Sequence, residues 1–172
     1  QGAGRTYDRF RDRVIWPIRD VSGDIVGFGA RRLADDAGPK YLNTPETVAY
    51  KKSQVLYGLY EARRAIAKEH QAVIVEGYTD VMACHLAGID TAVATCGTAF
   101  GSGHVKVLRR LLLDDDSAQV IFTFDGDAAG QKAALRAYDE DQQFAARTYV
   151  AIAGDGLDPC DLRLQRGDEA VR

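Results

Sequence analysis

The chain has 172 residues, of which 46% are hydrophobic, which suits one globular domain with a smaller subdomain. No apolar run approaches the roughly 18 residues that a membrane-spanning helix needs, and no N-terminal stretch has the pattern of a signal peptide. The net charge of −3 hides an asymmetry, because residues 1–60 carry +3 and residues 61–172 carry −6. We therefore expect a polyanion-binding surface in the first part and a cation site in the second.

The first and last residues favour a fragment of a longer protein, because the chain begins without Met and stops within a pattern. The three cysteines, Cys84, Cys96 and Cys160, are odd in number and form no Cys-x-x-Cys pair. This usage argues against a disulfide framework or a zinc site, and it favours a reducing cytoplasm.

Residues 13–32 predict a β-hairpin, with a turn at Ser22-Gly23-Asp24 between two strand-like segments. Because Pro17 has no backbone N–H, its strand is expected at a sheet edge or at a bulge. A polar connection follows over residues 35–54. Apolar residues at helical spacing then predict a helix over residues 55–69.

From residue 71 onward, apolar runs alternate with helical patterns, which predicts an α/β fold with a mostly parallel sheet flanked by helices. Gly88 is expected to end the first of these helices, and Ser102 to cap the second. We expect a smaller mixed α+β subdomain over residues 1–70 and the main domain over residues 71–172. The predicted elements are strands 72–76, 91–95, 118–124 and 147–152 and helices 79–87, 102–112, 128–144 and a short one from 159.

Two aspartates, Asp125 and Asp127, follow the apolar strand 118–124 directly. Side chains two apart in an extended chain share a face, and open α/β sheets bind ligands at the carboxyl ends of their strands. Two such carboxylates repel unless a cation lies between them, and oxygen-only donors suit Mg²⁺. Asp-Gly is also a common turn signal, so this pair alone fits an exposed turn equally well.

Acids at two further strand ends favour the metal site. Glu76 ends the strand before Gly77, and Asp158 follows the strand that ends at residue 152. Parallel strands bring such ends to one edge, so we expect these acids near Asp125 and Asp127. Asp80 falls in a first helical turn, where capping is the alternative to a contact with the metal cluster.

Other polar groups have simpler interpretations. The glycines of residues 97–103 predict a structural turn, since they match neither common phosphate-binding fingerprint. His70, His85 and His104 stand alone on helices or at their ends, so we expect packing or surface roles.

The basic residues of the first part include two short motifs, Arg9-Phe10-Arg11 and Lys40-Tyr41-Leu42-Asn43. Cationic, aromatic and amide groups together suit contacts with phosphates and stacking on bases. Interleaved acids such as Asp8 and Asp12 support the alternative, in which these arginines are paired on a solvated face.

The acidic motifs resemble those of the Toprim domain, which bacterial primases, topoisomerases, recombination-mediator proteins and some nucleases share. They are Glu76-Gly77-Tyr78-Thr79-Asp80, Asp125-Gly126-Asp127-Ala128-Ala129-Gly130 and Asp158-Pro159. The flanking segments are similar to those of DnaG-type primases in order and spacing. These segments are Arg9 to Asp20, Gly27 to Arg31, Pro39 to Thr47 and Leu56 to Leu59.

The resemblance implies a DNA-dependent RNA polymerase that makes short RNA primers on single-stranded DNA by metal-dependent nucleotidyl transfer. It implies Mg²⁺, with Mn²⁺ as an alternative, and ribonucleoside triphosphates as substrates. It implies work at the replication fork in the bacterial cytoplasm, a zinc-binding domain that precedes this chain, and a replicative helicase bound through a later domain. The implied catalytic metal ligands are Glu76, Asp125 and Asp127, supported by Asp80 and Asp158. The implied nucleotide- and DNA-binding residues are Arg9, Arg11, Lys40, Asn43 and Lys52.

The third acidic motif departs from the family pattern Asp-Pro-Asp, because Cys160 stands where the second acid is usual and Asp161 follows it. Two other functions remain open at this point. A topoisomerase or nuclease would use the same acids to cut DNA, and a binding module would hold nucleotides or nucleic acid without needing them.

Overall fold

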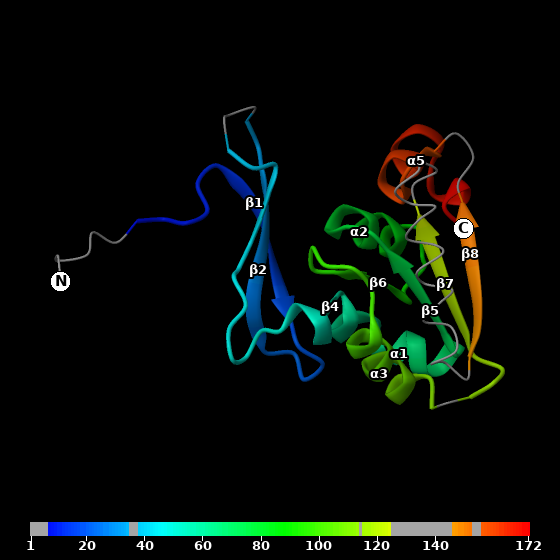
Figure 1. The fold of residues 1–172 in the computed structure, drawn as a ribbon. Coiled ribbons are helices and arrows are strands. Elements are labelled where there is room, and N and C mark those ends of the chain that lie inside the picture. Colours follow the sequence, from blue (N-terminus) through cyan, green and yellow to red (C-terminus); the bar gives the residue numbers. More distant parts are fainter. Residues whose placement is uncertain (1–6, 35–37, 114, 125–145, 153–155) are drawn as a thin grey trace.

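The computed structural model describes residues 7–34, 38–113, 115–124, 146–152 and 156–172, and its strands form two sheets (Figure 1). The first is antiparallel, with the order β1-β2-β3. The predicted hairpin is confirmed, and Pro17 lies on the edge strand β1. The polar connection contains the third strand and a 3₁₀ helix, η1. The bounds are β1 Arg13–Arg19, β2 Ile25–Arg32, β3 Tyr41–Asn43 and η1 Lys52–Gln54.

The second sheet has the order β4-β6-β5-β7-β8. Its last four strands are parallel to one another, whereas β4 pairs with β6 in the antiparallel sense. The predicted strands after residue 71 are thus confirmed to within a residue or so at each end. The bounds are β4 Leu56–Tyr57, β5 Gln71–Val75, β6 Ala92–Thr95, β7 Gln119–Phe124 and β8 Arg147–Ile152.

Helices cover both faces of this second sheet. The sequence predicted three of them after residue 71, and these are confirmed, whereas the predicted helix 128–144 lies outside the described residues. The bounds are α1 Leu59–Glu69, α2 Tyr78–Leu86, α3 Ser102–Leu111, α5 Pro159–Arg166 and a 3₁₀ helix, η3, Asp168–Ala170.

The predicted helix 55–69 is wrong over its first residues. Leu56 and Tyr57 form β4, where Leu56 pairs with Thr95 of β6. Gly58 then has a φ of +82°, a left-handed conformation that no helix can continue through. The helix therefore begins at Leu59, and the helical spacing of Leu56 is coincidental.

The predicted cap at Ser102 is also wrong. Gly101 holds the cap position in an extended conformation, and Ser102 is already the first helical residue. The ring of His104 takes the capping role, because its Nδ1 accepts from the Gly101 N–H at 3.2 Å. Gly88 ends α2 as expected, with a φ of +88° just after the last turn.

Alternating residues of the parallel strands fill two separate cores. Ile74, Val93 and Phe122 pack with α1 and α3 on one face. Val73, Val75 and Ala94 pack with α2 on the other. A sheet buried on both faces explains why its strands read as continuous apolar runs. Within the described residues, no helix is both long and apolar enough to span a bilayer.

A third apolar cluster joins the two sheets. Trp16 and Ile18 of β1 meet Tyr78 of α2 there, together with Tyr50 and Cys96. The three-stranded sheet thereby lies beside α2, at the end of the parallel sheet where the arrowheads of β5 and β7 lie (Figure 1).

Candidate active site

The carboxyl ends of β5 and β7 form the centre of the candidate site. These strands are parallel neighbours, with Ile74 paired to Phe122. The chain leaves β5 toward β6 on one side and returns to β7 on the other, so a topological switch point lies here. Open α/β sheets bind ligands at such points.

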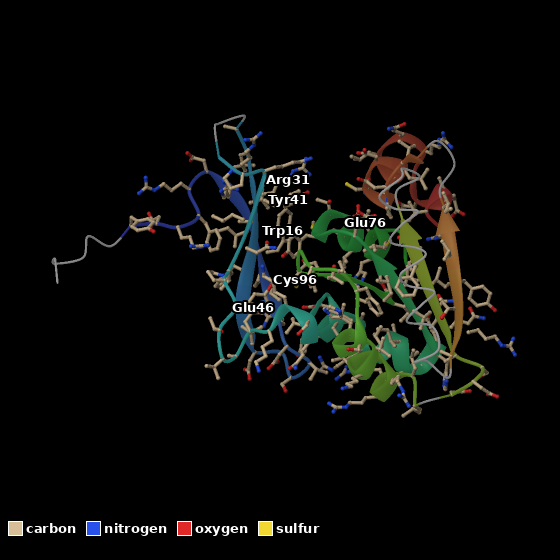
Figure 2. All side chains as sticks on the ribbon, viewed as in Figure 1. Trp16, Arg31, Tyr41, Glu46, Glu76 and Cys96 are labelled. Atoms are coloured by element: carbon tan, nitrogen blue, oxygen red, sulfur yellow. The ribbon has the colours of Figure 1, made fainter. Side chains whose placement is uncertain are left out.

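Glu76 is the first residue beyond β5, and its side chain is exposed at this end of the sheet (Figure 2). Strand β7 ends at Phe124, immediately before the predicted metal ligands Asp125 and Asp127. Both aspartates lie outside the described residues, so their predicted role stays a prediction. Because β7 pairs with β5, the strand that precedes these aspartates lies beside the strand that precedes Glu76.

Asp80 is buried in the first turn of α2, with 5% of its surface exposed. Its Oδ2 accepts from the Gly77 N–H at 2.9 Å, so the capping role is confirmed. The bond also holds the turn that carries Glu76. A contact of Asp80 with a metal stays a prediction.

Asp158 caps α5, where its Oδ1 accepts from the Asp161 N–H at 2.6 Å. Helix α5 packs against α2, which brings this acid toward Asp80. Burial raises the pKa of the Cys160 thiol, and the charges of Asp158, Asp80 and Asp161 raise it further, whereas Arg31 lowers it. This thiol is therefore within electrostatic range of three acids and of Arg31, which belongs to the three-stranded sheet.

Arg31 is a candidate that the sequence reasoning missed. It lies on β2, next to Tyr41 of β3 in the register, and both face the end of the parallel sheet that bears Glu76 (Figure 2). The guanidinium lies 5.7 Å from the Tyr41 ring centre, and the Lys40 ammonium lies 5.8 Å from it. The alternation of strand β2 was the available signal, since it puts Arg31 on the same face as Gly29 and Gly27.

Arg9 and Arg11 lie before β1 and are exposed. Arg9 donates to the backbone oxygen of Asn43 at 3.4 Å, which ties the N-terminal motif to β3. Arg11 donates to the Asp8 backbone oxygen at 3.2 Å and lies 6.0 Å from the Tyr7 ring centre. Both keep charged groups that face solvent, and their DNA-binding role stays a prediction.

Asn43 and Lys52 are held more firmly. The Asn43 amide accepts from the Tyr78 hydroxyl at 3.0 Å and donates to the Cys96 backbone oxygen at 3.2 Å. Lys52 donates its backbone N–H to Glu46 Oε1 at 2.8 Å. Asn43 thus has a structural role, and direct contact with a nucleotide stays a prediction for both.

Among the described residues, which leave out Asp125 and Asp127, no three His, Cys, Asp or Glu side chains gather closely enough to hold a metal ion. The donors near the strand ends are carboxylates, which suit a hard cation such as Mg²⁺. Glu76 is exposed at the required edge, so it fits such an ion provided that the aspartates after β7 complete the set.

A cavity of about 730 Å³ lies elsewhere, between α3, η1 and the end of β1. Arg19, Lys51, Lys106 and Arg110 are among its lining residues, but none of the predicted site residues is. This cavity is therefore separate from the candidate active site.

Comparisons with known proteins match both halves of the chain. A model of the DNA primase catalytic core, N-terminal domain, matches residues 1–63, and a Toprim domain model matches residues 70–151. The chain is 70% identical to the DNA primase of Streptomyces coelicolor over 172 residues, which cover 99% of this chain and 27% of that primase. The chain therefore spans about a quarter of the length of such relatives.

Solved structures agree with the fold. The RNA polymerase domain of Mycobacterium tuberculosis primase DnaG has a TM-score of 0.88 at 60% identity, over 96% of this chain and 55% of that chain. A DnaG primase catalytic domain bound to single-stranded DNA has a TM-score of 0.85 at 42% identity, over 99% of this chain and 54% of that chain. The expected fold class, a Toprim sheet preceded by a smaller mixed subdomain, is confirmed.

Proposed function

Because this chain belongs to the family of DnaG-type DNA primases, we propose that it joins ribonucleotides into RNA primers on a single-stranded DNA template. The observation that carries the proposal is the position of Arg31, Lys40 and Tyr41. Arg31 and Tyr41 are paired between β2 and β3 and face the end of the parallel sheet that bears Glu76 (Figure 2), and the Lys40 ammonium lies 5.8 Å from the Tyr41 ring centre. A nucleotidyl transferase needs both groups together, since it must hold polyphosphate and metal side by side.

The proposed reaction forms one bond and breaks one. The 3′-hydroxyl oxygen of the growing primer attacks the α-phosphorus of the incoming triphosphate, and the bond to the leaving pyrophosphate breaks. The hydroxyl proton goes to solvent. Little covalent chemistry falls to the protein, whose residues mainly position charged groups.

Each set of residues has a separate task. Glu76, Asp125 and Asp127 would hold Mg²⁺, or Mn²⁺ in its place, with Asp80 and Asp158 behind them. A bound divalent ion would neutralise the charge that develops on the transferring phosphate. The cations Arg31, Lys40, Arg9, Arg11 and Lys52 would bind the triphosphate and the template backbone, and Tyr41 offers a ring for stacking.

The remaining family properties are proposed on the strength of the relatives alone. We place the zinc-binding domain and the helicase contact in the parts of such primases that this chain does not span. Since the relatives are bacterial proteins, the proposed place of action is the replication fork in the bacterial cytoplasm.

A primer-synthesis assay tests the proposal in the natural protein that contains this chain. It uses single-stranded template, labelled ribonucleotides and Mg²⁺ or Mn²⁺. Wild type should extend primers, whereas Glu76→Gln and the pair Asp125→Asn and Asp127→Asn should lose at least about a hundredfold in kcat. Exposed Glu69→Gln at the end of α1 is the matched control and should act as wild type.

Other outcomes identify other functions. DNA cleavage by wild type without ribonucleotides would indicate a nuclease. DNA binding that survives every acid substitution, with no synthesis by wild type, would indicate a binding module. Calorimetric titration of Mn²⁺ should show weaker binding by the acid variants, and equal binding would contradict the metal assignment.

A further inference from the structure

Tyr78 links the two sheets at the point where the acid-bearing strand ends. It is the first residue of α2 and follows Glu76 by two positions. Its hydroxyl donates to Asn43 Oδ1 on β3 at 3.0 Å. Its ring stacks on Trp16 of β1, with the ring centres 5.2 Å apart and the planes at 10°. One side chain of α2, close to Glu76 in the chain, thus contacts two strands of the three-stranded sheet.

The position of the Tyr78 ring is set from every side. Tyr57 of β4 packs edge-on against it, with ring centres 4.8 Å apart. On β2, a Cβ atom at Gly29 would lie 2.3 Å from Tyr78 Cζ, so only glycine fits there. A tyrosine hydroxyl is protonated at neutral pH, so it can donate to Asn43 Oδ1.

Asn43 completes the connection. Its Nδ2 donates to the Cys96 backbone oxygen beyond β6 at 3.2 Å, while its Oδ1 accepts from Tyr78. Gly97 leaves room for this amide, because a Cβ atom there would lie 2.8 Å from Nδ2. Strand β3 therefore has one register relative to the parallel sheet, and that strand begins at Tyr41, directly after Lys40.

We propose that the Tyr78–Asn43 hydrogen bond is a positioning device, which sets the triphosphate-binding cations Arg31, on β2, and Lys40, just before β3, at the working distance from the metal-binding acids. The inference rests on the proposed function, adds Tyr78 to the site and gives Asn43 a positioning role. Each half of the site keeps its own contacts without this bond. What the bond supplies is the register between the halves, and a misplacement of about 1 Å can cost a hundredfold in rate.

The two sheets stay joined when the bond is removed. Trp16 still stacks on a phenylalanine ring, and its Nε1 still donates to Met82 Sδ of α2 at 3.1 Å. Tyr78→Phe should therefore fold, and this separates a positioning role from a role in stability.

The kinetic test uses the natural protein that contains this chain, with Tyr78→Phe, Asn43→Ala and the double variant. We expect kcat for primer synthesis to fall about tenfold in each single variant and no further in the double variant. In Tyr78→Phe, Mn²⁺ binding and single-stranded DNA binding should each stay within twofold of wild type. Tyr149→Phe, on an exposed part of β8, is the matched control and should keep full kcat.

Full kcat in Tyr78→Phe would overturn the proposal. A fall in kcat that merely follows weaker Mn²⁺ binding would also overturn it, because Tyr78 would then act on the metal. Asn43→Asp should restore part of kcat to the alanine variant, since a carboxylate still accepts from the Tyr78 hydroxyl.

A distance measurement tests the geometry without any activity, so it remains decisive even if the proposed function fails. Spin labels at Ile25→Cys on β2 and Leu86→Cys on α2, both at exposed positions, report the separation of the sheets. The background carries Cys160→Ser, and the other two cysteines are buried. Tyr78→Phe should shift or broaden the distance distribution. An unchanged distribution would contradict the link.

Discussion

Two small residues near the junction of the two sheets determine how the elements around them pack. Gly29 allows the Tyr78 ring to lie against β2, and Asp158 starts the helix that packs on α2. At each of these two positions, a small substitution tests whether the residue acts on the stability of the fold or on primer synthesis.

We expect Gly29→Ala to destabilise the fold by about 1–3 kcal/mol, because the new methyl group would overlap the Tyr78 ring. Tyr78 cannot retreat, since Trp16 and Tyr57 pack against it. Thermal denaturation measures the change. Gly101→Ala is the control, because nothing lies within 4 Å of the added atom. Equal melting temperatures for the two variants would contradict the packing argument.

Asp158→Asn should keep the stability of the fold and lose much of the primer synthesis. Asparagine caps a helix as well as aspartate does, so the bond to the Asp161 N–H survives while the charge is lost. Asp158→Ala should also lose primer synthesis, and in addition its free energy of unfolding should fall by about 1 kcal/mol, because alanine cannot cap the helix. Cys160→Ser should be close to neutral, because a protonated thiol is a poor partner for Mg²⁺. If Cys160→Ser lost more primer synthesis than Asp158→Asn, Asp158 would not be the acid that the third motif requires.

At the scale of elements, the contact between α3 and η1 depends on one buried histidine. His104 Nδ1 accepts from the Gly101 N–H, and Nε2 lies 2.7 Å from the Lys52 backbone oxygen. The ring must be neutral to accept at Nδ1 while it donates at Nε2. Burial lowers the pKa of His104 below the usual value of 6.5.

The free energy of unfolding should therefore fall as the pH drops below about 6.5. In that range the unfolded chain binds a proton that the folded chain does not, so acid favours unfolding. Chemical denaturation at pH 7.5, 6.5 and 5.5 measures this slope. His104→Gln should be less stable at pH 7.5 but should have a smaller slope, and His85→Gln is the control. An equal slope in wild type and His104→Gln would contradict the assignment.

At the scale of the whole molecule, opposite charges lie on opposite sides of the junction. The three-stranded sheet carries Arg31 on β2, with Lys40 just before β3, and the parallel sheet carries Glu76 at the end of β5. Tertiary structure therefore brings Arg31, a cation of the first part of the chain, to face the strand end of the second part that bears Glu76 (Figure 2).

Arg31→Gln with Lys40→Gln should weaken single-stranded DNA binding and reduce its salt dependence. Two lost phosphate contacts should lower the slope of log K against log salt by about 1.4. Fluorescence anisotropy over a series of salt concentrations measures both quantities. Lys68→Gln with Arg147→Gln removes the same charge from exposed positions elsewhere and should leave the slope nearly unchanged. Equal slopes for the two double variants would place the DNA on another surface.

Much of the architecture could be predicted, because its signals are local. The apolar runs of β5 to β8 are short and bounded, and the helices between them have their own periodicity. The pairing of β4 could not be predicted, since Leu56 and Tyr57 become a strand only through contact with β6. The same limit applies to His104, whose ring takes the capping role at Gly101 that the sequence assigned to Ser102.

The sequence by itself determined the alternation of strands and helices, the acids that follow β5 and β7, and the motifs of the primase family. Only the tertiary structure decided that Arg31 faces the strand end that bears Glu76, and that Asn43 bonds to Tyr78, 35 positions along the chain, and to Cys96, 53 positions along. Periodicity and strand-end chemistry are properties of neighbouring residues, so they can be recognised in the chain. A hydrogen bond between distant residues depends on how two sheets pack, and no local pattern records that packing.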